Sequence, residues 1–194
     1  MIKANENERR EYFRIDDEVY LDLEVVSEEE YSHAAETLAN LHDSSFSLSA
    51  DFATLNNNIH PVLNNIRQSY PEIAEYLEFI NKKIDNLSQL MLIEETSFDE
   101  NKLINANISA SGIMFSTDLK LKTQQGIKLE LVLFPEKIGI LIYGKVINTQ
   151  TESDNNRNMV SIEFEHMRPE DQELMIKHNL NRQMAELREK NDNN

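Results

Sequence analysis

Two short polar stretches, far apart in the chain, have residue types and spacing suited to binding an anionic ligand. The first contains three arginines within six positions, Arg9, Arg10 and Arg14. A guanidinium makes bidentate hydrogen bonds to phosphate and stacks on flat rings. Arg10 and Arg14 are four residues apart, so the pair suits one anionic ligand better than a diffuse surface. A solvated, basic N-terminal segment is the alternative interpretation of this stretch.

The second stretch runs from Asn107 to Gly112 and reads Asn-Ile-Ser-Ala-Ser-Gly. Asn107 offers amide donors and an acceptor, while Ser109 and Ser111 offer hydroxyl groups. Gly112 allows the backbone to turn or to approach a ligand closely. Taken alone, such a run is typical of a polar turn between two strands. Its interest comes from the arginines that precede it in the chain.

The composition favours a globular protein that avoids polyanions. The chain has 194 residues, a formal net charge of −16 and no cysteine. An acidic chain should repel DNA and RNA, whose binding requires clustered basic residues, and also anionic membranes. Without cysteine there is no disulfide framework. The N-terminus lacks the apolar segment of a signal peptide and no run of about 20 apolar residues occurs, so we expect a cytoplasmic protein.

Alternating apolar and polar residues predict short strands that flank a block of helices. Short strands with turn signals between them favour a small antiparallel barrel. A helix should follow the last strand from Arg168. We therefore expect an α+β fold, with a six-stranded barrel formed by residues 1–26 and 95–194 and a helical insertion at 27–94. The predicted strands lie near 19–25, 103–109, 113–115, 128–133, 138–149 and 160–164.

The insertion should contain one helix near 27–41 and two longer helices after it. Pro61 should kink the second helix or mark a joint, and Pro71 should begin the third. Both longer helices have apolar residues at alternating spacings of three and four, which is the pattern of a helix–helix seam. These seam residues are Phe52, Leu55, Ile59, Val62 and Ile66 in the second helix, and Ile73, Leu77, Ile80, Ile84, Leu87 and Met91 in the third.

These seams have two possible interpretations. The two helices can bury their stripes against each other within one chain. Alternatively, helices some 30 to 36 Å long would extend beyond a small barrel and leave apolar surface for another copy. We favour self-association into a homo-oligomer, with parallel and antiparallel order both open.

Together, the two polar stretches resemble the signature of the PilZ family, RxxxR near the start and [D/N]xSxxG further along. Arg10 and Arg14 match the first part, Arg9 supplies the doubled arginine often seen there, and Asn107, Ser109 and Gly112 match the second. The resemblance extends over about 8–26 and 103–187. It departs from the family at the helical block, because the family usually joins the first two strands by a short hairpin.

The resemblance implies a PilZ-like six-stranded barrel that binds the bacterial second messenger cyclic di-GMP. The ligand-binding residues would then be Arg9, Arg10, Arg14, Asn107, Ser109, Ser111 and Gly112. The family signals through protein partners in motility, pilus, biofilm or virulence control. We expect no enzymatic activity, no cofactor other than this ligand and no metal, since the five histidines lack metal-binding spacing. A PilZ-like scaffold that acts by protein contact, with weak or no nucleotide binding, is the alternative.

Overall fold

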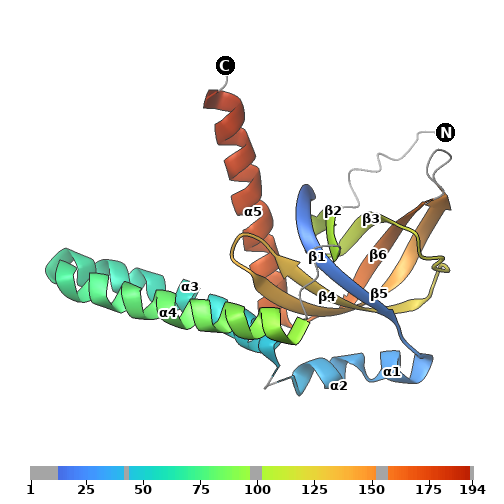
Figure 1. Cartoon of the computed structure of the whole chain (residues 1–194), viewed down its shortest axis with the longest axis horizontal. Helices are drawn as coiled ribbons and strands as arrows, with labels where there is room; N and C mark the ends of the chain where they lie inside the picture. The colour runs from blue at the N-terminus through green and yellow to red at the C-terminus, as the bar shows by residue number, and fades with distance from the viewer. Residues whose placement is uncertain (1–12, 42–43, 97–101, 152–156, 193–194) are drawn as a thin grey trace, which may run out of the picture.

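Six strands close into a barrel with helices around it (Figure 1). The structure is a computed structural model that describes residues 13–41, 44–96, 102–151 and 157–192. The strands are β1 (Ile15–Val25), β2 (Leu103–Ser109), β3 (Gly112–Thr117), β4 (Gly126–Leu133), β5 (Ile138–Thr151) and β6 (Asn158–His166). Their order round the barrel is β1-β2-β3-β6-β5-β4, and each neighbouring pair is antiparallel. The predicted α+β class with a closed antiparallel barrel is therefore confirmed.

β1 is the strand that closes the barrel. Its first half, from Ile15 to Tyr20, pairs with β2, and its second half, from Tyr20 to Val25, pairs with β4. Asp16 and Glu18 are exposed, whereas Ile15, Asp17 and Val19 beside and between them are buried. This alternation follows from the period of two in a strand, which sends successive side chains to opposite faces.

The barrel is filled by branched apolar side chains from all six strands. Leu129, Leu131 and Leu133, which the alternation places on one face of β4, are all almost fully buried. Burial of each such side chain is worth roughly 1.5 to 3 kcal/mol relative to exposure. The barrel interior is therefore the main source of stability for the strands that hold the polar stretches.

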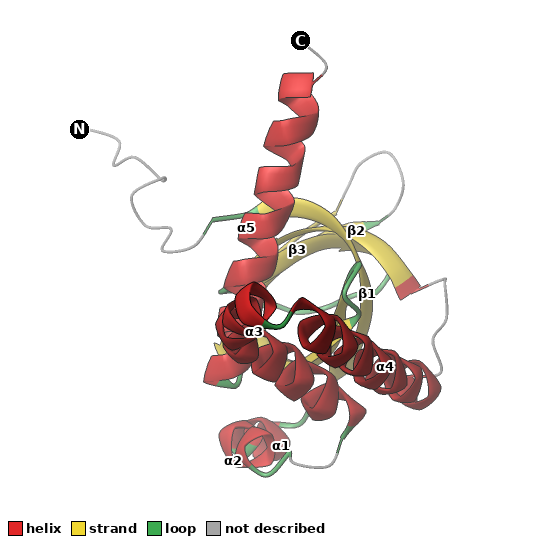
Figure 2. Cartoon of the chain, turned by 90° about the vertical axis from the view of Figure 1, so that its left-hand side faces the viewer, coloured by secondary structure: helices red, strands yellow, loops and turns green. Residues whose placement is uncertain are grey.

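Helices occupy the chain between β1 and β2 and the part after β6. They are α1 (Glu28–Ser32), α2 (Ala34–Ala39), α3 (Ser45–Ser69), α4 (Pro71–Thr96) and α5 (Pro169–Asp192). α3 and α4 lie side by side as a hairpin that projects from the barrel, and Figure 2 views this hairpin nearly end on. α1 and α2 lie on another side of the barrel (Figure 1).

The helix predicted at 27–41 is broken into α1 and α2 at His33, so that prediction was wrong in this detail. The hydroxyl of Ser32 donates to the carbonyl of Glu29 at 2.7 Å, and His33 Nδ1 lies 2.8 Å from the same oxygen. The backbone N–H of His33 then donates to Glu30 instead, three residues back. Side chains that compete for a helical carbonyl in this way interrupt the regular ladder.

The long helices start and end at identifiable signals. α3 begins at Ser45, earlier than the apolar spacing indicated, because the side chain of Ser44 accepts a hydrogen bond from the backbone N–H of Ser47. α3 continues through Pro61 as one helix, so the proline marks no joint. α4 begins at Pro71 as predicted, where the missing N–H costs nothing.

Two small apolar clusters attach the helices to the outside of the barrel. Tyr20 and Val132 from the strands pack with Phe46 of α3 and Leu92 of α4. A second cluster joins the barrel to α1 and α2; it consists of Val26, Ala34, Leu38, Leu141 and Tyr143. β4 and β5 are thus buried on both faces in part of their length, which explains why their sequences contain continuous apolar runs.

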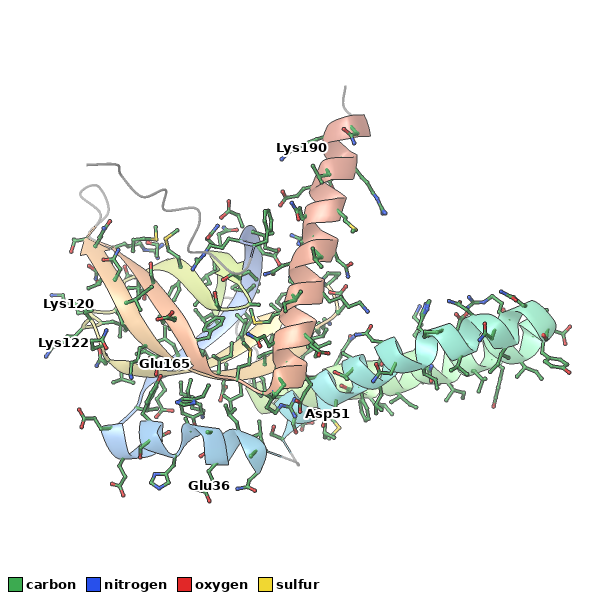
Figure 3. All side chains as sticks on the ribbon, turned by 180° about the vertical axis from the view of Figure 1, so that it is seen from behind. Glu36, Asp51, Lys120, Lys122, Glu165 and Lys190 are labelled. Carbon is green, nitrogen blue, oxygen red and sulfur yellow. The ribbon has the colours of Figure 1, made fainter. Side chains whose placement is uncertain are left out.

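Polar contacts reinforce these attachments. The hydroxyl of Tyr31 in α1 donates to Glu165 Oε2 at 3.0 Å, and Lys145 Nζ lies 3.1 Å from the same oxygen. Glu165 is labelled in Figure 3, at the barrel edge that faces α1. The buried guanidinium of Arg168 pairs with Asp51 at 3.1 Å, where α3 meets the base of α5 (Figure 3). The orientation of the helices is therefore fixed at several points.

α5 covers one end of the barrel and then extends beyond it. Met175 is fully buried among the core residues of the strands, and Leu174 is also buried. The distal part of α5 projects away from the barrel (Figure 1). Leu180, Met184 and Leu187 on that part are about half exposed. The first turns of α5 thus belong to the core, and the last turns are a projecting arm.

Candidate functional site

The second polar stretch forms the hairpin between β2 and β3. Ser109 pairs with Gly112, so Ala110 and Ser111 are the two loop residues. Neither loop residue has a positive φ, unlike the turns that usually close two-residue hairpins. The buried hydroxyl of Ser109 supports the turn instead: it donates to the carbonyl of Gly112 at 3.2 Å and accepts from the backbone N–H of Ser111 at 3.3 Å. Ser109 therefore shapes the hairpin from inside.

Gly112 is required by close packing of the backbone. Its φ is negative, so a left-handed conformation is not the reason for glycine here. A Cβ atom on Gly112 would lie 2.6 Å from the carbonyl oxygen of Ile162 in β6 and 3.4 Å from Nη2 of Arg14. The glycine thus lets β3 approach β6 and leaves room for the guanidinium above the hairpin.

The arginine stretch and the hairpin meet at the start of β1. Arg14 Nη1 donates to Asn107 Oδ1 at 3.4 Å, a long hydrogen bond, while the other terminal nitrogen lies over Gly112. Ninety-three residues separate Arg14 from Asn107, and the β1–β2 pairing brings them together. Arg9 and Arg10 lie outside the described residues. The fold therefore unites Arg14 with the second stretch at one barrel edge.

An acidic residue outside both polar stretches completes this edge. Asp16 lies directly opposite Asn107 in the β1–β2 register, and Asp16 Oδ1 accepts a hydrogen bond from Asn107 Nδ2 at 2.7 Å. Asp16 is exposed and Asn107 is half-buried. The only sequence signal for Asp16 is its position two residues after Arg14, shortly before the strand predicted at 19–25.

On the other face of β1, α5 holds the same short segment. His178 Nε2 lies 2.7 Å from Asp17 Oδ2, and Arg182 Nη2 lies 2.5 Å from Asp17 Oδ1. Burial raises the pKa of Asp17, but the hydrogen bond and charge of His178 and the charge of Arg182 outweigh this, so the pKa lies below its ordinary value. Gln172 Nε2 also donates to the carbonyl of Ala110 in the hairpin, at 3.5 Å. α5 thus contacts both segments that form the site.

Comparison with protein families decides the identity of this barrel. The family model described as "PilZ domain" matches residues 92–180. Residues 92–180 are therefore similar to a PilZ domain. The matched residues include the Asn107–Gly112 hairpin, but they begin near the end of α4, so β1 and Arg14 are outside them. β1 completes the same barrel, as the strand between β2 and β4.

Two solved structures are similar to this chain. One similar structure is a pathogenic protein from Xanthomonas campestris, described as a tetrameric PilZ domain self-assembled via an unusual helical bundle; it is 12% identical, 91% of each chain is covered, and the TM-score is 0.53. Another is the Bacillus subtilis inhibitor of motility MotI/DgrA, 19% identical, with a TM-score of 0.39 and 45% of this chain covered. That match spans 44% of the MotI chain, less than half. No curated protein matches the sequence.

The helical hairpin beside the barrel leaves most of the predicted seam residues exposed. Ile59 is 48% exposed, Ile73 is 53% exposed and Leu87 is 62% exposed. The hairpin is instead held by other residues: Leu63 and Ala74 are buried, and Asn56 Nδ2 donates to Asp85 Oδ1 at 2.6 Å between the two helices. The two stripes therefore do not bury each other within one chain.

The exposed seam of α4 lies on a separate side of that helix. At 100° per residue, Ala74, Ser88 and Leu92 fall roughly 100° round the helix from the centre of the stripe formed by Ile84 and Leu87. The first three residues are buried and the last two are exposed. One side of α4 thus packs against its own chain, and the adjacent apolar side faces solvent.

The described parts of the chain provide neither a metal site nor a membrane-spanning helix. Within 13–41, 44–96, 102–151 and 157–192, there is no cluster of acidic, histidine or cysteine side chains able to hold a metal ion. Among the helices described, none combines the length and the apolar character needed to cross a membrane.

Proposed function

We propose that this protein is a receptor for cyclic di-GMP. The observation that carries the proposal is the meeting of Arg14 with Asn107 and Gly112, which joins the two parts of the PilZ signature at one edge of the barrel. The ligand has two phosphates and two guanines. Arginine forks bind phosphate oxygens and the O6 and N7 acceptors of guanine, whereas amide and hydroxyl groups bind base edges.

In this proposal each residue of the signature has a distinct role. Arg14 would contact the ligand from above the hairpin, and Arg9 and Arg10 would add further guanidinium groups from the preceding segment. Asn107 and Ser111 would contact a guanine, since both are partly accessible. Ser109, which is fully buried, would instead hold the turn in shape. The local positive charge would overcome the repulsion expected from a net charge of −16.

Binding would order the arginine motif and so create a signal. Arg14 is in contact with the hairpin in this structure, so the proposed ordering concerns the residues before it. Two phosphates would relieve the mutual repulsion of three neighbouring guanidiniums. The ordered segment and the barrel would then present a new surface to a protein partner, in one of the processes that PilZ proteins control. Such a change requires that the ligand bind the ordered state more tightly.

Calorimetric titration of the full chain with cyclic di-GMP tests the receptor function. We expect a dissociation constant in the micromolar range or tighter, which corresponds to about −8 kcal/mol or stronger. Absence of heat, together with absence of competition against a labelled ligand at millimolar concentration, would leave only a scaffold function.

We also propose that the chain assembles through the helices of residues 27–94, which we interpret as an insertion into the barrel domain. The exposed seams favour this second function, because large exposed apolar stripes mark interaction sites. A second copy would bury the stripes in a coiled-coil or helical-bundle interface. The Xanthomonas protein, which self-assembles via a helical bundle, shows that a PilZ fold is compatible with such an assembly.

Assembly and nucleotide binding are separable functions in this proposal. The exposed seam residues lie on α3 and α4, whereas Arg14 and Asn107 lie on β1 and β2 at the barrel. A scaffold with weak or no nucleotide binding would retain assembly through the helices and lack binding at the barrel. The titration described above therefore distinguishes a receptor that assembles from a scaffold alone.

A further inference from the structure

We propose that Asp16 is a selectivity residue that makes this site prefer guanine, an inference that rests on the proposed binding of cyclic di-GMP. Asp16 lies on the outward face of β1, two residues after Arg14 and directly opposite Asn107. Its carboxylate accepts one hydrogen bond from Asn107 at 2.7 Å. A carboxylate has about four acceptor positions, so this bond leaves capacity for a ligand.

The contact with Asp16 fixes the direction of the Asn107 carboxamide. Nδ2 points toward the carboxylate, and Oδ1 therefore points toward Arg14, whose Nη1 is 3.4 Å away. The reversed carboxamide would place an oxygen against the carboxylate and a donor against the guanidinium. Both reversed contacts are repulsive, so the orientation is determined by the two charged neighbours.

Guanine and adenine differ in what they offer to this pair. The Watson–Crick edge of guanine has two adjacent donors, N1–H and N2–H, beside the O6 acceptor, whereas adenine has one amino donor beside the N1 acceptor. A carboxylate can accept both guanine donors at once, and it repels the N1 lone pair of adenine. Asn107 cannot replace it, because one of the two polar atoms of a carboxamide is a donor. Asp16 thus supplies the charged acceptor for the Watson–Crick edge of guanine.

The position of the charge also argues for contact with a base. The PilZ signature allows aspartate or asparagine at position 107, and this chain has the neutral residue there. The carboxylate lies instead on the neighbouring strand β1, at Asp16, opposite position 107. A carboxylate beside Arg14 would weaken a site that bound only phosphates, since like charges repel. A role in base recognition accounts for an acid in a site that must attract an anion.

Titrations of full-length variants with cyclic di-GMP and cyclic di-AMP test this inference. Asp16→Asn keeps the size of the side chain and removes the charge. We expect it to weaken cyclic di-GMP binding by about tenfold or more, the range for loss of a bidentate base contact, without weakening cyclic di-AMP binding. Glu18→Gln is the matched control, because Glu18 is the next exposed acid on this face and lies opposite Asn105. It should leave both affinities unchanged.

A charge-swap variant, Asp16→Asn combined with Asn107→Asp, adds a second test. It keeps one carboxylate and one carboxamide in the pair, so it should recover a large part of the preference for cyclic di-GMP. The inference is overturned if Asp16→Asn binds cyclic di-GMP as tightly as the wild type, or if it loses affinity for both dinucleotides equally. A wild type that binds cyclic di-GMP while Asp16→Asn is unaffected leaves the receptor function standing. A wild type that binds neither ligand overturns both proposals.

Discussion

Asp17 of β1 and His178 of α5 are joined by a buried 2.7 Å hydrogen bond, although 161 residues separate them in the chain. Arg182 completes the cluster from the next turn of α5. Asp17 directly follows Asp16, so the strand segment that carries the site on its outer face is held by α5 on its inner face. The position of the site therefore depends on the docking of α5.

This cluster predicts a loss of stability in acid. The folded pKa of Asp17 lies below the ordinary value, so its contribution is fully present above about pH 4 and is lost as the pH falls through the lowered value. Asp17→Asn should reduce the free energy of unfolding by about 1 to 3 kcal/mol at neutral pH, and by less near pH 3. Urea denaturation at several pH values measures this. Glu18→Gln is the control; an equal effect of Asp17→Asn at every pH would contradict the prediction.

Arg14→Ala should weaken cyclic di-GMP binding by about 1.5 to 3 kcal/mol, the range for hydrogen bonds to charged groups. The fold should be unchanged, because Arg14 precedes β1 and is only half-buried. Arg157→Ala is the matched control: Arg157 is exposed, pairs with Asp118, and lies at the opposite end of the β3–β6 pair from Gly112. Calorimetry should find wild-type affinity in the control. Equal losses in both variants would indicate a general effect of charge.

Gly112→Ala should both destabilise the barrel and abolish tight binding. The added methyl group would lie 2.6 Å from the Ile162 carbonyl oxygen, so β3 and β6 must separate. Overpacking of this kind costs about 1 to 3 kcal/mol. Thermal unfolding should show a lower midpoint for this variant than for Ser111→Ala, which alters the neighbouring, partly exposed position. A midpoint equal to that of the wild type would contradict this prediction, because it would mean that β3 and β6 can separate without loss of stability.

Ile80→Glu combined with Ile84→Glu should dissociate the proposed assembly. Both residues belong to the α4 seam, and a charge placed in an apolar interface is costly unless it is paired. We expect light scattering to report a dimer or larger species for the wild type and a smaller species for this variant, with the barrel still folded. Lys82→Glu is the control, since Lys82 is exposed on another side of α4. A wild type that is monomeric at tens of micromolar would refute the assembly.

Local patterns predicted most of the architecture. The alternation at Leu129, Leu131 and Leu133 predicts one buried face of β4, and the structure buries all three. Pro71 at the first turn of α4 and the turn before Ile138 follow from backbone chemistry that acts within a few residues. The two motifs that resemble the PilZ signature placed Arg14 and Asn107 in one site, and their side chains meet in the structure.

Features that depend on distant contacts could not be predicted in the same way. No local pattern links Asp17 to His178, because that contact depends on how α5 docks onto the barrel. None shows that Asp16 would lie opposite Asn107, because strand register decides that pairing. The break at His33 depends on two side chains that compete for one carbonyl. The reason for Gly112 was also hidden: its close neighbour is the backbone of β6, far along the chain.

Hydrogen exchange with and without cyclic di-GMP tests the central claim most directly, namely that one ligand engages the arginine segment and the hairpin together. We predict that the nucleotide increases protection both in residues 8–15 and in residues 107–112, with little change at the helical seams. Arg10→Ala should lose both increases. Protection confined to another part of the chain, or an arginine segment equally protected with and without the ligand, would contradict this account even if binding is observed.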